Sequence, residues 1–191
     1  MAEITIFGKG NMGQAIGGLM TQGGNQVTYL GHADAVTTLG TIVILAVPYP
    51  AALAIAKANA TQLAGKVVVD VTNPLDFDTW DGLVVPADSS ATAQLAELLP
   101  ESQVIKAFNT TFAGTLVAKQ VGGAAPTKVL TAGDSTEAKQ ALAAALAGSD
   151  VAVIDAGSLK RARELEAYGF LQMTLAASEQ ISWNGGFAVL K

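Results

Sequence analysis

Gly8-Lys9-Gly10-Asn11-Met12-Gly13 is the stretch from which the architecture of this chain can be predicted. It follows a short apolar run, residues 4–7, that predicts a strand, and it precedes residues 14–20, which predict a helix. A G-x-G-x-x-G between a strand and a helix is typical of dinucleotide-binding sites, because each glycine lets backbone or phosphate approach closely. The helix start adds free N–H groups, so the loop is expected to bind a pyrophosphate.

The composition narrows the classes of function. The chain has 191 residues, no cysteine, a single histidine, His32, and a net charge of -5. These counts exclude disulfides and cysteine metal sites and argue against a multi-histidine metal centre, so no metal is expected. The negative charge makes nucleic acid an unfavourable partner. Apolar runs such as residues 42–47 are too short to span a bilayer, and the N-terminus lacks a signal-peptide pattern. We therefore expect a cytoplasmic protein with a small-molecule ligand.

Predicted strands alternate with predicted helices from the glycine loop onward. Several strands, including residues 42–47 and 67–71, are continuous apolar runs, which is typical of a sheet covered on both faces. The pattern predicts an α/β, doubly wound, mostly parallel sheet, a Rossmann-like NAD(P)-binding fold in a single domain over residues 1–191. A long C-terminal helix is expected over about residues 158–182. Residues 33–40 are too few for the helix that normally separates the second and third strands.

The end of the second strand favours NADP over NAD. An acidic residue there would bind the 2′-hydroxyl of NAD and repel a 2′-phosphate. This strand ends in Gly31 and His32 without an acid, and Asp34 follows in the loop. His32 can donate a hydrogen bond to a phosphate and can carry a positive charge. The sequence therefore predicts NADP(H). The alternative for His32 is a solvated loop residue.

Polar or aromatic residues follow the next three strands. Tyr49 comes after the third strand, Asn73 after the fourth, and Asn109 and Thr110 after the fifth. Ligands bind at the carboxyl ends of the strands in such sheets, so these side chains are expected at one site. The alternative is that Tyr49 packs against a helix and that the asparagines only satisfy turns.

Six motifs together resemble the NADPH-dependent coenzyme F420 reductase family, the F420-dependent NADP oxidoreductases. In chain order they are Gly8 to Gly13, Ala46-Val47-Pro48-Tyr49, Asp70-Val71-Thr72-Asn73-Pro74-Leu75, Lys106-Ala107-Phe108-Asn109-Thr110, Ala132-Gly133-Asp134 and Asp155-Ala156-Gly157-Ser158-Leu159. The resemblance implies that the glycine loop holds the pyrophosphate, that Val47, Pro48 and Tyr49 line the nicotinamide ribose and ring, and that Asn73, Asn109 and Thr110 lie near the hydride-transfer face. The predicted cofactor-binding residues are Gly8, Lys9, Gly10, Asn11, Met12, Gly13, Gly31, His32, Ala46, Val47, Pro48, Tyr49, Asn73 and Asn109.

The resemblance implies an oxidoreductase that moves hydride between NADP(H) and a second ring, either F420 or a flavin. The family commonly ends its second strand in Ser-Arg, where this chain has Gly31-His32. Two alternatives remain open. One is an NADP-binding regulatory domain without catalysis. The other is a pyrroline-5-carboxylate or imine reductase, which is disfavoured because only the chain from Leu159 onward is left for a helical dimerisation domain.

No side chain is expected to act as an essential acid or base. The chain has no cysteine, and its histidine is predicted at the adenine end. Asn73, Asn109 and Thr110 can position rings but do not titrate near neutrality. The nearest titratable candidates are Tyr49, Asp76 and Lys106, whose ordinary pKa values lie far from 7.

The long C-terminal helix predicts a homodimer. It carries apolar residues on more than one face, and such a helix needs a second surface to cover it. The residues concerned are Leu159, Ala162, Leu165, Phe170, Leu171, Met173 and Leu175.

Overall fold

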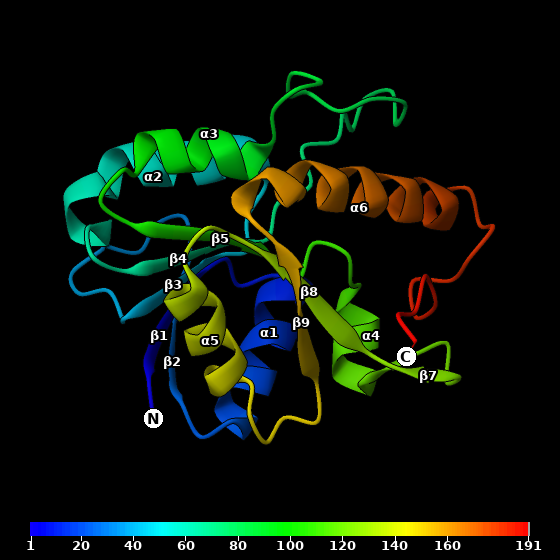
Figure 1. Ribbon diagram of the computed structural model, residues 1–191, viewed down its shortest axis with the longest axis horizontal. Coiled ribbons are helices and arrows are strands. Elements are labelled where there is room, and N and C mark those ends of the chain that lie inside the picture. The colour runs from blue at the N-terminus through cyan, green and yellow to red at the C-terminus, as the bar shows by residue number, and fades with distance from the viewer. Residues whose placement is uncertain (191) are drawn as a thin grey trace.

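The computed structural model describes residues 1–190, which form a seven-stranded sheet with helices on both faces (Figure 1). The elements are β1 (Glu3–Phe7), α1 (Asn11–Gln22), β2 (Gln26–Leu30), β3 (Ile42–Leu45), α2 (Tyr49–Leu63), β4 (Val67–Asp70), α3 (Ala91–Leu98), β5 (Gln103–Ala107), α4 (Ala113–Ala118), β6 (Gln120–Val121), β7 (Ala125–Pro126), β8 (Lys128–Ala132), α5 (Thr136–Ala145), β9 (Ala152–Gly157), the 3₁₀ turn η1 (Leu159–Arg161) and α6 (Ala162–Ala177). Helices α1, α4 and α5 lie on one side of the sheet, and α2, α3 and α6 lie on the other (Figure 1).

The strand order of the main sheet is β2-β1-β3-β4-β5-β8-β9. Strands β2, β1, β3, β4 and β5 are parallel neighbours, whereas β8 runs antiparallel to β5 and parallel to β9. The predicted α/β, mostly parallel, Rossmann-like sheet is confirmed. Because the chain turns outward from β1 to β2 and then returns past β1 to β3, the order reverses at β1, where such sheets bind their ligands.

Two apolar cores hold the layers together. On one face, Ile16, Leu19 and Met20 of α1 pack on the central strands. On the other face, residues of α2 and α3, including Leu63 and Leu95, cover them. All four residues of β3 are buried, in agreement with a strand covered on both sides. Among the helices in residues 1–190, none combines the length and the apolar character needed to cross a bilayer.

The structure confirms one local prediction and corrects the bounds of another. No helix forms between β2 and β3, as the shortness of that segment predicts. The helix expected over residues 158–182 is shorter, because it begins as the 3₁₀ turn η1 and α6 ends at Ala177. Glu179 adopts a left-handed φ of 59°, and the N–H of Gln180 donates back to the carbonyl of Leu175 at 2.9 Å. This closing turn satisfies the helix end and redirects the chain.

Candidate functional site

The glycine loop joins β1 to α1 at the point where the strand order reverses. Gly8 has a φ of +116°, and a Cβ there would overlap the carbonyl oxygen of Ala46 on the neighbouring strand end. A Cβ on Gly13 would likewise overlap the carbonyl oxygen of Gly8. Around Gly10, by contrast, a Cβ would meet no atom within 4 Å. The backbone is thus packed tightly at two glycines and leaves open space at the third, which is the arrangement that a pyrophosphate requires.

The start of α1 is chemically suited to an anion. No side chain caps this helix, and Gly10 occupies the N-cap position in an extended conformation. The first N–H groups of a helix have no partner within the helix, and the positive end of its dipole lies there. Asn11 and Met12, at the first turn, line the adjoining cavity. The residues present therefore fit the phosphates of a dinucleotide.

A cavity of 680 Å³ lies on the β2 side of the glycine loop. It is bounded by the loop, the end of β2 and one face of α2. Apolar side chains such as Val36 and Ile55 contribute to its walls, which suits an adenine ring. The predicted cofactor-binding residues that line it are Gly8, Lys9, Gly10, Gly31, His32, Val47 and Pro48.

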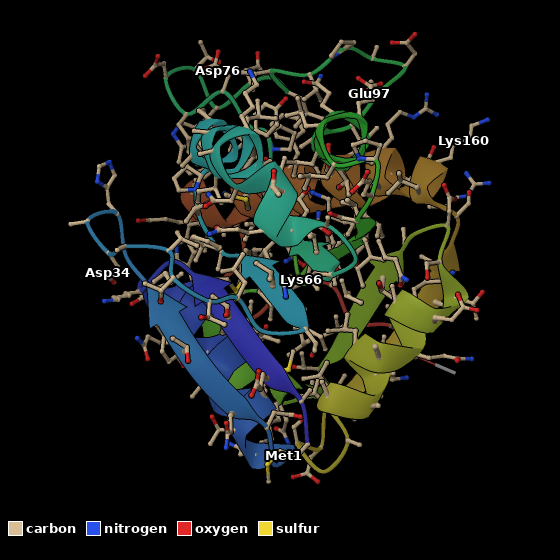
Figure 2. The ribbon with its side chains drawn as sticks, turned by 90° about the vertical axis from the view of Figure 1, so that its left-hand side faces the viewer. Met1, Asp34, Lys66, Asp76, Glu97 and Lys160 are labelled. Carbon is tan, nitrogen blue, oxygen red and sulfur yellow. The ribbon has the colours of Figure 1, made fainter. Side chains whose placement is uncertain are left out.

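The end of β2 differs from the sequence expectation in one respect, because an acid does lie there. Asp34 folds back so that its Oδ2 accepts a hydrogen bond from the N–H of Gly31 at 2.7 Å and pairs with Lys9 Nζ at 2.6 Å. These interactions, with the Lys9 hydrogen bond the largest, hold the pKa of Asp34 below its ordinary value. The short Gly31-x-x-Asp34 spacing places the carboxylate within reach of the N–H three residues before it, which is the local sequence signal for this arrangement. Figure 2 shows Asp34 on the loop beside the edge strand.

A second cavity, of 520 Å³, lies on the other side of the glycine loop, over the carboxyl ends of β3 and β4 and the segment that follows β5. The predicted residues that it brings together are Asn11, Met12, Ala46, Val47, Pro48, Tyr49, Asn73 and Asn109. Thr110 is not among its lining residues. Its side chain is buried, and its carbonyl accepts from Gln172 at 3.3 Å.

Asn73 and Asn109 form a reciprocal pair in the wall of this cavity. Asn109 Nδ2 donates to Asn73 Oδ1 at 2.9 Å and to the carbonyl of Leu165 at 2.8 Å. Asn73 Nδ2 donates to the carbonyl of Asn109 at 2.9 Å and contacts Met173 Sδ at 3.3 Å. Both amide N–H₂ groups are therefore engaged with protein atoms. The pair ties the ends of β4 and β5 to α6 and so shapes the cavity rather than offering free donors to a ring.

The titratable groups near the cavity, Tyr49 and Asp76, also form hydrogen bonds with other protein groups. The Tyr49 hydroxyl donates to Gln94 Oε1, and burial, together with the charges of Glu166 and Asp70, raises the pKa of Tyr49. Asp76 accepts hydrogen bonds from Thr79 and from the N–H of Asp78, and these hydrogen bonds, with the Thr79 side chain the largest cause, lower the pKa of Asp76. Neither shift brings a group toward neutrality.

Lys106 belongs to a buried ion network beneath the cavity, which the sequence did not indicate. Its Nζ lies 2.7 Å from Asp70 Oδ2, 2.9 Å from Glu166 Oε1 and 2.7 Å from the carbonyl oxygen of Thr72. Glu166 also accepts from the N–H groups of Ala91 and Thr92 at the start of α3. Since all three N–H bonds of the ammonium have an acceptor, Lys106 holds α6 and the two strands together.

The segment after α6 supplies part of the wall of the second cavity, and the sequence analysis did not identify it. Trp183 packs on Phe112 with ring centroids 4.9 Å apart, and Trp183 and Phe77 both line the cavity while 48% and 53% exposed. The carbonyl of Asn184 accepts from the N–H of Gly122 at 2.8 Å, which fastens the segment near α4 (Figure 1). Only the tertiary fold brings these aromatic rings to the site.

Known proteins resemble this chain in sequence and in structure, although no family model matches it. F420-dependent NADP reductase of Methanocaldococcus jannaschii is 32% identical over 134 residues, which cover 67% of this chain and 58% of that protein. The resemblance to F420-dependent NADP reductases is confirmed. Metalloreductase STEAP3 of Rattus norvegicus is 38% identical over 108 residues, which cover 56% of this chain and 21% of that protein. The chain thus spans little more than half of the first relative and about a fifth of the second.

A crystal structure from Arthrobacter sp. FB24, provisionally named an F420-dependent NADP reductase, superimposes with a TM-score of 0.83. The two chains are 24% identical, and the match covers all of both. This likeness extends over the complete sheet and the C-terminal helix, so it confirms the fold.

Proposed function

We propose that this chain is an oxidoreductase that transfers hydride between NADP(H) and a flavin-like or F420-like acceptor. One observation carries the proposal: Val47 and Pro48 line both cavities, so the cavity proposed for the adenosine half of a dinucleotide adjoins the second, aromatic-walled cavity at one strand end. A cofactor laid across the glycine loop would place its nicotinamide in the second cavity, where an acceptor ring could stack. The name of one sequence relative, F420-dependent NADP reductase, supports this chemistry, and the other relative is also named a reductase.

The cofactor supplies the hydride, and the protein supplies binding and orientation. The glycine loop and the start of α1 would hold the pyrophosphate. Val47, Pro48 and the ring of Tyr49 would border the nicotinamide, and Trp183 and Phe77 would cover the acceptor. Holding two rings face to face can account for much of a hydride-transfer rate. No side chain needs to exchange a proton near pH 7, because Tyr49, Asp76 and Lys106 are all engaged as described above.

An acceptor screen tests the proposal. NADPH oxidation is measured with F420, FMN, FAD, quinones and ferric chelates as acceptors. The matched control is Gly10→Asp, because a side chain there meets open space but adds a negative charge where the pyrophosphate binds. Turnover with a ring acceptor that is lost in Gly10→Asp is the expected result. Tight NADPH binding without oxidation by any acceptor would instead identify a regulatory NADP-binding domain.

The lining of the second cavity argues against the alternative that this chain is a pyrroline-5-carboxylate or imine reductase. A small imine needs a proton at nitrogen when hydride arrives. Among residues 1–190, those that line the second cavity include no aspartate or glutamate, and the Tyr49 hydroxyl there already donates to Gln94. The same assay with pyrroline-5-carboxylate and cyclic imines separates the two cases, and reduction of an imine in preference to a ring acceptor would favour the alternative.

The proposal includes a cytoplasmic homodimer that forms through α6. The inner face of this helix is covered, since Leu165 and Ala176 are buried, while Leu171 on its outer face is 52% exposed. A partner helix laid against Leu171 and Leu175 would bury this apolar strip. Light scattering at micromolar protein is expected to give twice the chain mass, and Leu171→Asp is expected to give a monomer. A monomeric mass for the unaltered chain would exclude the dimer.

A further inference from the structure

Lys9 and Asp34 form an ion pair that bridges the glycine loop and the end of β2. The separation of Nζ and Oδ2 is 2.6 Å, and both side chains are partly exposed, at 52% and 39%. The same carboxylate oxygen accepts the N–H of Gly31 at 2.7 Å. A Cβ on Gly31 would lie only 3.4 Å from Asp34 Oδ2 and from Cδ and Cε of Lys9, so the pair is packed over this glycine.

The Lys9–Asp34 pair lies where a dinucleotide-binding sheet contacts the adenosine ribose. In a sheet that carries the glycine fingerprint, the residues after the second strand contact the adenosine ribose, and its 2′ position distinguishes NAD from NADP. Lys9, Gly31, His32 and Asp34 all line the cavity on that side. Along the walls of this cavity in residues 1–190, Lys9 is the only lysine or arginine, and Asp34 is the only acid.

The charges compete for the same position. A 2′-phosphate would carry its negative charge toward Lys9, but Asp34 already neutralises that cation and occupies the Gly31 N–H. Exposed ion pairs contribute little free energy, so a phosphate that forms charge-assisted hydrogen bonds can displace the carboxylate. A 2′-hydroxyl carries no charge, and it can donate to Asp34 while the pair stays closed.

We propose that Asp34 and Lys9 are a specificity-determining pair. When NAD(H) binds, Asp34 accepts a hydrogen bond from the 2′-hydroxyl of the cofactor. When NADP(H) binds, the 2′-phosphate displaces the Asp34 carboxylate from Lys9 and from the Gly31 N–H. Asp34 therefore weakens the preference for NADP(H) over NAD(H), and Lys9 is the residue that favours NADP(H). The inference rests on the proposed dinucleotide function and identifies which residues of that site distinguish its two cofactors.

Calorimetric titration tests the pair without any need for turnover. NADPH, NADH and the fragment 2′,5′-ADP are titrated into the unaltered protein, Asp34→Asn and Lys9→Met. Asp34→Asn is expected to bind NADPH and 2′,5′-ADP about tenfold more tightly, the change that one charge-assisted contact supplies, and NADH a few-fold more weakly. Lys9→Met is expected to lose about tenfold in NADPH affinity and to keep NADH affinity within about twofold.

A second exposed pair serves as the control, because Lys119 and Asp150 lie 3.0 Å apart and line neither cavity. Lys119→Met and Asp150→Asn should leave both affinities unchanged, and thermal unfolding should show that all four variants are folded. An unchanged ratio of NADPH to NADH affinity in Asp34→Asn would overturn the inference and leave the proposed function standing. Failure of the unaltered protein to bind any of the three ligands would overturn the proposed function itself.

Discussion

The ammonium nitrogen of Lys106 lies 2.9 Å from a carboxylate oxygen of Glu166, and both side chains are buried. Lys106 comes from β5 and Glu166 from α6, so the contact holds the C-terminal helix over the carboxyl ends of the strands. Asp70 of β4 completes the network, which contains one positive and two negative charges. The second cavity keeps its shape because this network fixes the helix that carries part of its wall.

The charge count of this network makes its two obvious variants unequal. Lys106→Met leaves two buried carboxylates facing each other without a cation, so it is expected to cost about 3–5 kcal/mol of unfolding free energy. Glu166→Gln leaves the Lys106–Asp70 pair intact, but it removes the second carboxylate charge beside Lys106 and weakens the hydrogen bonds to α3, for a cost of about 1–3 kcal/mol. Urea unfolding of both variants measures the difference. Equal losses would show that the charges are not coupled as the distances indicate.

Gly169 permits the close contact between α6 and the asparagine pair. A Cβ at this position would overlap Asn73 Oδ1 and lie 2.9 Å from the carbonyl oxygen of Asn109. Gly169→Ala is therefore expected to destabilise the protein by about 1–3 kcal/mol, as overpacking does. The control is Gly18→Ala in α1, where a Cβ meets no atom within 4 Å and alanine should stabilise the helix by about 0.5–1 kcal/mol. Opposite shifts in melting temperature are expected, and a neutral Gly169→Ala would contradict the packing argument.

Trp183 is expected to act on the acceptor rather than on the cofactor. Its ring lies in the wall of the second cavity and not of the first, so Trp183→Ala should lower kcat/KM for a ring acceptor about tenfold through lost stacking and burial. The affinity for NADPH should change less than about twofold, which corresponds to under 0.5 kcal/mol.

Two further variants separate stacking from general damage around Trp183. Trp183→Phe retains an aromatic ring and should recover most of the activity. Val84→Ala alters another exposed apolar side chain outside both cavities and should change nothing. A loss of NADPH affinity as large as the loss of acceptor efficiency would place Trp183 on the cofactor instead.

Turnover with saturating NADPH should vary little between about pH 6 and pH 8, the range in which a tuned catalytic group would titrate. The raised pKa of Tyr49 keeps its hydroxyl protonated throughout that range, and the lowered pKa of Asp76 keeps its carboxylate ionised. Tyr49→Phe should accordingly leave the shape of the pH profile unchanged. A steep bell that disappears in Tyr49→Phe or Asp76→Asn, with NADPH affinity intact, would identify a catalytic acid or base.

Much of this architecture follows from patterns that are local in the chain. The glycine spacing after β1 and the apolar run of β3 predicted a parallel sheet that alternates with helices. The shortness of the segment between β2 and β3 predicted that no helix forms there. Such features depend on backbone sterics and on periodic burial, which are properties of a few neighbouring residues. Tyr49, Asn73 and Asn109 were predicted at one cavity for the same reason, because parallel strands end at the same edge.

Only the tertiary structure decided which partners these residues have. The sequence places Asp34 outside the second strand, yet the loop returns its carboxylate to Gly31 and Lys9. Likewise, Lys106 and Glu166 are distant in the chain, and no local sequence pattern around either residue predicts that they form a buried ion pair. Trp183 reaches the cavity only because the chain turns back after α6. Contacts between distant residues depend on how whole elements pack, and no local pattern in the sequence contains that information.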